Sequence, residues 1–389
     1  MSSSRGFALI AALGVMTFLM LSGVALLTRG LWQADAGFRT EHRSSALYLA
    51  EAAVDQAARN LRTPETSDDI LTAALGTGTF QIEEQTPVAS LRYRVTARGV
   101  SQQQQRRLEV ILLLTPQSAF QFALFGSQNV TVSGNAITDS YDSRKGPYHD
   151  EDPESPAYNA GPDGDVGTNG VSAGGITVSG SIFVDGQLAV GPEVPDPASV
   201  VTGYDPAFIT GGTTPPSDTQ DVVSQETLFS MPSVSVPEGL ACPDYTVAGN
   251  TTTTLSPGTY CYHDLAIQGN ATLTASGSVT IYLTGSLTAS GNSVVGAVDN
   301  PRTMTVLMAS TSEAILEEGQ ITGSNKFYGS LYGPKATLTI SGNAEVFGSV
   351  IAKSINVSGS AAIHRDLALS DTTNVTNTYT VARRAWRER

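Results

Sequence analysis

Ionisable side chains gather between residues 139 and 165. The run YDSRK at 141–145 precedes HDED at 149–152, and Asp163 and Asp165 add two further carboxylates. Loops rich in carboxylate oxygens bind Ca²⁺ when their ligands follow a fixed spacing. Neither the EF-hand spacing nor that of glycine-rich nonapeptide repeats occurs here. A solvated acidic loop is the favoured interpretation, calcium binding is the alternative, and we predict no metal ligands.

Carboxylates in this region could also act as an acid and base pair on a glycan. Glycoside cleavage needs two such groups facing one scissile bond, and Asp139, Asp142 and Asp185 are the candidates. The repeated segments around them are dominated by Ser, Thr, Asn and Ala, without a paired acid and base signature. His364 lies near Asp366 in sequence and is interpreted as a side chain of a terminal repeat. We predict no catalytic residue and no cofactor.

The elements that would position these groups begin with an uncharged run at residues 7–28, which lies between Arg5 and Arg29. At 1.5 Å per helical residue, such a run covers roughly the 30 Å hydrocarbon thickness of a bilayer. The segment can therefore span a membrane. A cleaved secretory signal is the alternative, because Ala34-Asp35-Ala36 has the small-residue form of a cleavage site.

The N-terminus resembles that of type IV prepilins. The stretches SSRGFALIAALGVMTFLMLSGVALL and ALYLAEAAVDQAARNL are similar to PilX-type minor pilins over residues 1–62. The resemblance implies cleavage by a prepilin peptidase after Gly6, methylation of Phe7 and a cytoplasmic N-terminus. Major pilins carry a glutamate at the fifth mature position, which is Ala11 here, and this departure favours a minor component. The residues expected to hold the subunit in the inner membrane and against other pilins are Phe7, Leu9, Ile10, Leu13, Val15, Phe18, Leu21 and Leu27.

The helix is predicted to continue past the membrane and to end at Pro64. Residues 7–62 would then extend about 84 Å, much more than a bilayer requires. Residues 79–115 next predict three antiparallel strands, TFQIEEQ, SLRYRVTARGV and RRLEVILLL, which would pack on the helix as in a pilin head. The apolar stripe of the second half of the helix is Leu47, Ala50, Val54, Ala57 and Leu61.

Beyond Pro116 a repeat begins. VTVSGNAITDS at 130, ITVSGSIFVDG at 176, LTISGNAEVFGSVIA at 338 and INVSGSAAIHRDLAL at 355 alternate apolar residues and share a Gly followed by Asn or Ser, and LAIQGNATLTASGSVTIYLTGSLTASGN at 265 has the same form. Glycine reaches the left-handed backbone conformation cheaply, so it suits the corners of a solenoid. We predict a β-helix, with a β-sandwich as the alternative.

The predicted β-helical region resembles an uncharacterised domain found behind prepilin N-termini and distantly similar to bactofilins. The resemblance rests on LFGSQNVTVSGNAITDSYDSRKGP, FYGSLYGPKATLTISGNAEVFGSVIA and IHRDLAL, and it implies no known ligand. Ten of the 19 prolines lie between Pro192 and Pro257, which predicts an irregular insertion at about 187–260. Cys242 and Cys261 are predicted to form a disulfide in an oxidising compartment, contributing about 3 kcal/mol. His263 alone is too little to add a zinc site.

The domains expected are a leader at 1–6, a membrane and stalk helix at 7–62, a small sheet at 63–116, a β-helix at 117–370, and a terminal strand with a basic tail at 371–389. The net charge of −14 argues against nucleic acid, whose phosphates would be repelled. We predict a minor pilin-like subunit that takes part in type IV pilus assembly and displays a β-helix outside the cell, with adhesion to an unknown surface ligand as one role. The alternatives are a membrane-anchored surface enzyme acting on polysaccharides and a tether that never enters a fibre.

Overall fold

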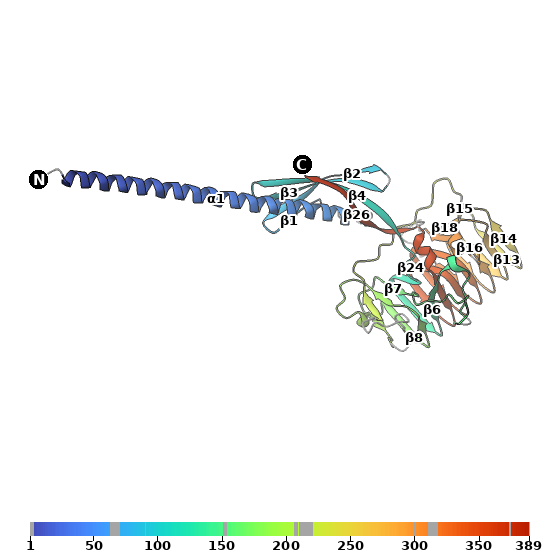
Figure 1. Cartoon of the computed structure of the whole chain (residues 1–389). Coiled ribbons are helices and arrows are strands. Elements are labelled where there is room, and N and C mark those ends of the chain that lie inside the picture. Colours follow the sequence, from blue (N-terminus) through green and yellow to red (C-terminus); the bar gives the residue numbers. More distant parts are fainter. Residues whose placement is uncertain are drawn as a thin grey trace. The chain divides into compact units, whose positions relative to one another are not determined.

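The chain folds into two compact units (Figure 1). Unit 1 comprises Met1–Thr115 and Tyr379–Arg389, and unit 2 comprises Pro116–Thr378. The protein is mainly β with one long N-terminal helix among the described residues, as predicted. This computed structural model describes residues 4–62, 71–89, 91–150, 154–205, 209, 221–298, 300–309, 318–372 and 375–388.

Unit 1 pairs a helix with an antiparallel sheet. The helix α1 runs from Ser4 to Arg62, and the order in the sheet is β1-β2-β3-β4-β26. β2 and β4 contain the predicted strands TFQIEEQ and RRLEVILLL, and β3 begins at Arg92, within the predicted strand SLRYRVTARGV. β26, the last strand of the chain, lies beside β4, so two distant parts of the sequence complete one sheet. The strands are β1 (Thr72–Leu75), β2 (Gly78–Ala89), β3 (Arg92–Ser101), β4 (Gln104–Ser118) and β26 (Thr376–Glu388).

The second half of α1 packs on this sheet through its predicted stripe. Ala50, Val54 and Ala57 are fully or almost fully buried against inward-facing side chains such as Val95 and Leu112. The approach is close at Gly99 of β3, where an added Cβ would lie 2.1 Å from the carbonyl oxygen of Ala46. A glycine is therefore required where the helix crosses the strand.

Unit 2 consists of many short strands that pair in parallel. From β13 to β20, each strand pairs with the strand three positions later, so β13 pairs with β16, β14 with β17 and β15 with β18. Successive repeats therefore stack in three parallel ladders. The long strands β23 and β24 each take part in more than one ladder. The strands up to β15 are β5 (Leu124–Gly134), β6 (Ile137–Tyr141), β7 (Val166–Thr168), β8 (Ile176–Gly180), β9 (Phe183–Val184), β10 (Leu188–Val190), β11 (Val201–Thr202), β12 (Val222–Ser224), β13 (Tyr245–Gly249), β14 (Thr252–Leu255) and β15 (Gly258–Tyr262).

The remaining strands continue these ladders, and short 3-10 helices lie between some of them. The strands are β16 (Leu265–Gly269), β17 (Thr272–Ala275), β18 (Val279–Leu283), β19 (Leu287–Ala289), β20 (Val294–Val295), β21 (Met304–Met308), β22 (Glu318–Ile321), β23 (Lys326–Ile340), β24 (Glu345–Val357) and β25 (Ala362–Asp366). The 3-10 helices are η1 (Ser143–Lys145), η2 (Pro197–Val200), η4 (Pro301–Thr303) and η5 (Leu367–Asp371). Inward-facing Val, Ile and Leu side chains form the core between the ladders.

The spatial order of the repeats differs from their order in the sequence. β5, the first strand of unit 2, pairs with β24 on one side and with β7 and β8 on the other, and β6 pairs with β25. The chain thus starts inside the stack, proceeds to one end at β12 and restarts at β13 at the other end. The first two strands of unit 2, β5 and β6, therefore pair with its last two, β24 and β25.

Glycines mark one corner of the stack, as the repeated motif predicted. Gly134, Gly180, Gly342 and Gly359 have φ between 74° and 95°, in the left-handed region that favours glycine. They also touch one another through their backbones, because a Cβ on Gly134 would lie 2.4 Å from the carbonyl oxygen of Gly359. Both the conformation and the spacing between repeats therefore depend on glycine here.

The Pro-rich range at about 187–260 contains strands β10 to β14 as well as the segment that joins the two ends of the stack. Part of that segment packs on the stack. The Tyr332 hydroxyl donates a hydrogen bond of 2.7 Å to the Pro232 carbonyl, and the Phe229 ring lies 4.2 Å from that of Phe125. The prolines are thus compatible with strands that are short or that end the ladders.

Candidate functional site

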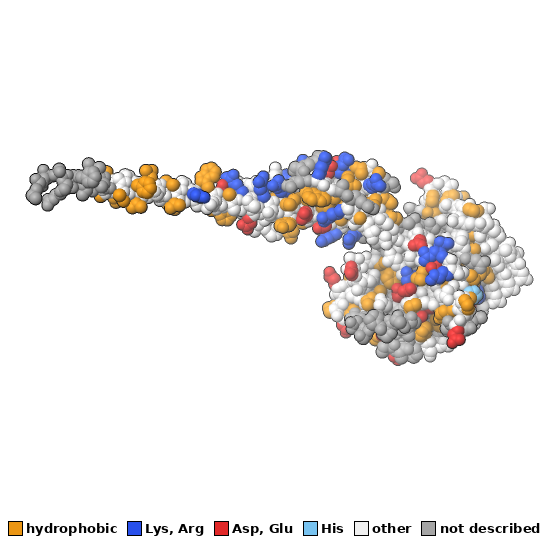
Figure 2. All heavy atoms as spheres, viewed as in Figure 1, with side chains coloured by type: hydrophobic (Ala, Val, Ile, Leu, Met, Phe, Trp, Pro, Cys, Tyr) orange, Lys and Arg blue, Asp and Glu red, His pale blue; other side chains and the backbone are white. Residues whose placement is uncertain are grey.

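The predicted assembly residues lie on the first half of α1, whose apolar side chains are exposed over the described part (Figure 2). The window Ala12–Arg62 contains a stretch of mean hydropathy 1.7 that is long and apolar enough to cross a membrane. Leu13, Val15, Phe18, Leu21 and Leu27 are each between 59% and 70% exposed. The side chains of Gly6, Phe7, Leu9 and Ile10 lie outside the described residues.

The basic C-terminal residues pair inside unit 1. Arg383 contacts Asp55 of α1, and Arg387 binds Glu109 of β4 with its guanidinium 3.0 Å from Oε1. Tyr379 and Val381 pack against the core under the helix. The sequence predicted a terminal strand here but did not place it in the first sheet. The alternation of residues is visible in the sequence, whereas the pairing of β26 with β4 is not.

Cys242 and Cys261 form the predicted disulfide. Cys261 belongs to β15 in the terminal repeat, and Cys242 lies three residues before the start of β13 in the same repeat. The bridge joins residues 19 positions apart. It therefore fastens the segment that arrives from the far end of the stack to the repeat in which the ladder restarts.

The candidate acidic residues are engaged with separate partners. The Asp139 carboxylate lies 2.6 Å from Nδ1 of His364 and accepts a hydrogen bond from the Tyr148 hydroxyl. Asp142 caps η1 and binds Arg144, which holds the pKa of the Asp142 carboxyl below its usual value. Glu151 and Asp152 of the acidic loop lie outside the described residues.

His364 and Asp139 meet because their strands are neighbours in a parallel ladder, in which the two residues are in register. They are 225 positions apart in the chain, and both are at least 93% buried. The sequence placed His364 near Asp366, whereas the Asp366 carboxylate accepts from the backbone of Ser143 and Ala368. The local spacing gave no signal for the His364–Asp139 pair.

A buried basic side chain lies next to this pair. Arg365 is 8% exposed, donates to the Asp163 carbonyl at 3.0 Å and lies 3.6 Å from the Asp165 carboxylate. Burial raises the pKa of Asp165, while the Gln187 backbone N–H and Arg365 oppose this effect. Burial also raises the pKa of Asp366. These groups connect β25 to the loop at Asp163 and Asp165 and to the backbone of Ser143 in η1.

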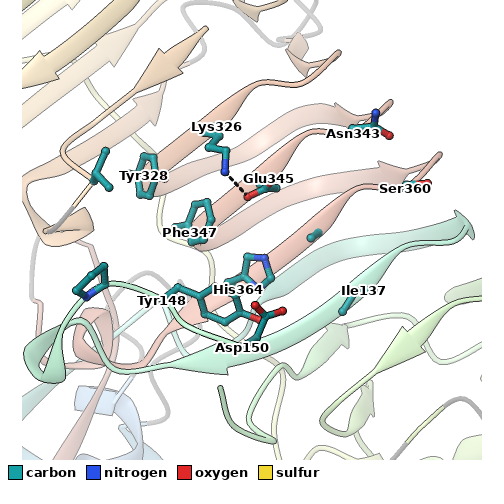
Figure 3. Close-up of a pocket in the computed structure, with 13 residues that line it drawn as sticks. Ile137, Tyr148, Asp150, Lys326, Tyr328, Asn343, Glu345, Phe347, Ser360 and His364 are labelled. Carbon is teal, nitrogen blue, oxygen red and sulfur yellow. Dashed lines mark hydrogen bonds and ion pairs between the residues drawn. The ribbon is translucent and has the colours of Figure 1, made fainter. Parts of the chain in front are cut away.

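A pocket of about 600 Å³ lies over the outer face of β23, β24, β25 and β6 (Figure 3). Two outward-facing columns form its base. The first contains Lys326, Glu345, Ala362 and Ile137, which are in register on successive strands, and the second contains Tyr328, Phe347 and His364. Lys326 Nζ lies 2.9 Å from Glu345 Oε2.

The aromatic side of the pocket, formed by the second column and Tyr148, is firmly held. The rings of Tyr328 and Phe347 stack with centroids 4.5 Å apart, and Tyr148 lies 3.9 Å from the His364 ring. The segment that carries Tyr148 is pinned by Asn159, whose side chain binds the Pro147 carbonyl and the His149 N–H. Asp150, Val298, Asn343 and Ser360 complete the rim.

The described residues also contain one exposed group with possible metal-ligand atoms. Asp244, His263 and Asp264 each place such an atom within 4.8 Å of the others. Ser286 donates to Asp264 through its backbone N–H and its hydroxyl, which lowers the pKa of the Asp264 carboxyl. Exposed acidic groups are common without a bound ion, so we assign no metal here.

Comparisons with known proteins cover parts of these features. A family model described as a domain of unknown function (DUF7305) matches residues 263–372, which is less than half of the chain. The search of curated proteins gives no match. The competence-associated pilin ComZ from Thermus thermophilus aligns over 90% of this chain and 97% of its own, with 9% identity and a TM-score of 0.28. The DUF3494 domain of ice-binding protein 1 from Shewanella frigidimarina aligns over 65% and 98%, with 14% identity and a TM-score of 0.31. Both TM-scores are too low to carry an argument about fold or function.

Proposed function

We propose that this chain is a minor pilin-like subunit of a type IV pilus or a related fibre. In this proposal a prepilin peptidase cuts after Gly6, Phe7 becomes N-methylated, and the first half of α1 crosses the inner membrane once. The resemblance of residues 1–62 to PilX-type prepilins supports these steps. Unit 2 is then displayed outside the cell, on the fibre or on the cell surface.

The observation that carries the proposal is the division of α1 into two halves with different surroundings. The second half is buried on an antiparallel sheet, whereas the first half exposes large apolar side chains such as Phe18 at 70%. A continuous apolar surface of this kind is stable only when lipid or another protein covers it. In a bilayer, lipid would cover this surface, and in a fibre the helices of neighbouring subunits would cover it. A subunit that moves from the membrane into a fibre therefore keeps its apolar surface covered throughout.

We further propose that unit 2 is a β-helix related to the bactofilin-like domain and spans about residues 117–370. Its three parallel ladders, buried aliphatic columns and stacked corner glycines support this assignment. Such a rigid body fits a role in adhesion or spacing, because a repeating scaffold presents the same surface over a long distance.

We propose that the protein is not an enzyme. Asp139 and Asp142, two of the three carboxylates considered for catalysis, are each engaged with a partner of their own, His364 and Arg144, which supports this proposal. The competing hypothesis, a membrane-anchored enzyme acting on polysaccharides, requires sugar release by the full chain. A reducing-end assay on oligosaccharides incubated with the purified full chain should show no product above the blank.

Mass spectrometry of the native N-terminus tests the pilin proposal. The mature chain should begin with N-methylated Phe7, and it should be found in the sheared fibre fraction. A chain that keeps Met1 would support a tether outside any fibre, and a chain that begins near Gly37 would support a cleaved secretory signal. Either result would overturn the proposal.

Two matched glycine variants make this test specific. Gly6→Leu should keep residues 1–6 and should be lost from the fibre fraction, because the peptidase acts at this glycine. Gly14→Leu places the same side chain within the span, at a position where an added Cβ meets no atom within 4 Å. It should be processed normally. Equal processing of both variants would contradict cleavage at Gly6.

A further inference from the structure

We propose that the pocket over β23, β24, β25 and β6 is a binding site for a neutral oligosaccharide. The inference goes beyond the pilin role and stands on geometry within unit 2, so it does not depend on processing at Gly6. A ligand site needs a preformed hollow, an apolar surface and a few polar groups at fixed places. The pocket has all three.

The hollow exists because Ala362 is small. In the first column it lies between Glu345 and Ile137, so the larger neighbours rise on either side of it. The column continues to Phe183 of β9, which is in register with Ile137. Ile137 and Phe183 are each 41% exposed, so an apolar strip extends from the base of the pocket.

This strip has the dimensions of a chain of sugar rings. Lys326 and Phe183 lie on the first and the last of five successive strands, and four strand spacings of about 4.8 Å cover about 19 Å. The flat apolar face of a pyranose packs on aliphatic and aromatic side chains, and Phe183 presents such a surface. The strip therefore fits several rings in line, with the first one held in the pocket.

Polar groups at the base and the rim of the pocket fit the hydroxyl edge of the same ring. Glu345 and Asp150 offer carboxylate acceptors, Lys326 offers ammonium donors, and Asn343 offers both kinds. His364 lines the pocket and is held by the Asp139 carboxylate through Nδ1. Hydroxyls donate and accept at once, so a polyhydroxylated ligand can satisfy a mixed set of this type.

The walls are held before any ligand binds. Tyr148 is fixed by its hydrogen bond to Asp139 and by its contact with the His364 ring, and Asn159 pins the backbone on both sides of it. A preorganised wall reduces the entropy lost on binding. This favours recognition of a sugar, whose individual contacts are weak.

Charge selects against acidic saccharides. Unit 2 contains 7 Lys and Arg against 25 Asp and Glu, a net charge of −18. Within the pocket, the Lys326 ammonium is already paired with Glu345, and Asp150 remains as a further negative charge. Uronic acids would be repelled, while neutral hexose chains would not.

The test measures binding of the full chain in lauryldimethylamine oxide micelles, because this detergent carries no sugar headgroup. The probes are cellotetraose, maltotetraose, mannotetraose and chitotetraose as neutral chains, and tetragalacturonate as the acidic one. We expect saturable binding of at least one neutral tetrasaccharide by calorimetry and none of tetragalacturonate. No binding by any of the four neutral chains, or equal binding of the acidic one, would overturn the proposal.

Substitutions in the pocket test whether the oligosaccharide binds there. Ala362→Phe fills the hollow and should abolish binding, whereas Ala266→Phe adds the same ring to an outward position on β16, in a different ladder, and should leave the affinity unchanged. Glu345→Gln should weaken binding about ten-fold or more, the usual effect of losing a charged acceptor.

Phe183→Ala tests whether the ligand extends along the apolar strip or occupies the pocket alone. The affinity for the tetrasaccharide should fall about five-fold or more, because a ring contact is lost. The affinity for the monosaccharide of the same sugar should not change. Circular dichroism melts confirm that each variant is folded. Unchanged tetrasaccharide affinity in folded Ala362→Phe would show that binding occurs elsewhere and would refute the assignment.

Discussion

At the scale of single residues, the buried ionisable groups of unit 2 are distinguished by their partners. Asp366 is fully buried and accepts backbone N–H groups from Ser143 and Ala368 at 3.0 Å each. Burial outweighs these bonds, so its pKa is raised. Asp264 is partly exposed and receives two bonds from Ser286, so its pKa is lowered. The two carboxylates should therefore respond to pH in opposite directions.

The variants Asp366→Asn and Asp264→Asn test whether the two carboxylates change the free energy of unfolding with pH in opposite directions. With a raised folded pKa, Asp366 binds more protons in the folded state, so its contribution to stability falls as pH rises above its unfolded pKa of about 3.9. Asp264 contributes stability above that pH and loses it as pH falls through its lowered folded pKa. Denaturant unfolding from pH 3 to 8 measures both.

The difference in unfolding free energy between wild type and Asp366→Asn should decrease with rising pH, and that for Asp264→Asn should increase. Asparagine keeps one side-chain oxygen that can accept these hydrogen bonds in both variants, so the comparison isolates the charge. Two differences that change with pH in the same direction would show that burial does not dominate at Asp366.

At the scale of elements, the repeat depends on its corner glycines more than on any one strand. Gly134 has φ 85° and lies between Gly180 and Gly359 of the adjacent repeats. Gly174 has φ 86°, yet an added Cβ there would meet no atom within 4 Å. Substitutions at these two glycines therefore distinguish the cost of the left-handed backbone conformation from the cost of a clash between adjacent repeats.

Gly174→Ala should destabilise unit 2 by about 1 kcal/mol, the cost of a left-handed residue with a Cβ. Gly134→Ala should cost about 3 kcal/mol or more, because its Cβ also forces adjacent repeats apart. Thermal unfolding followed by circular dichroism measures the difference. Similar losses in both variants would mean that the repeats relax around the added methyl group.

The corner motif was legible in the sequence, and the alternating residues beside it predicted which side chains are buried. Val130, Ile176, Leu338 and Ile355 all face the core as their period of two requires. The pocket was not predictable in this way. Its first column draws Lys326, Glu345, Ala362 and Ile137 from four strands, and only the register between those strands places them together.

At the scale of the whole molecule, unit 2 is inserted between two strands of the first sheet. The chain leaves unit 1 through β4 and returns through β26, which lies at the edge of the sheet beside β4. Unit 1 is thus completed only after all of unit 2 has been synthesised. Tyr379 and Val381 then pack on the core shared by α1 and β4.

Deletion of Tyr379–Arg389 should destabilise unit 1 by about 2–4 kcal/mol through lost burial and an exposed strand edge. Hydrogen exchange should show lost protection in β4 and unchanged protection in β16 to β18. The control is Arg383→Gln with Arg387→Gln, which keeps the strand but removes the ion pairs to Asp55 and Glu109. It should cost less than about 1 kcal/mol, because both guanidinium groups are exposed and Arg94 stays near Glu109. Unchanged protection of β4 after the deletion would contradict a closing role for β26.

The amino-acid sequence by itself determined the long helix and the repeating character of unit 2, because both follow from local periods: an uncharged run with a helical stripe, and alternation ended by glycine. The tertiary structure alone decided which repeats are neighbours. All repeats present similar strand edges, so no local pattern tells β5 to pair with β24, or β26 with β4. The sequence equally leaves open whether β25 pairs with β6, and this pairing brings Asp139 to His364 and Ala362 beside Ile137 at the pocket.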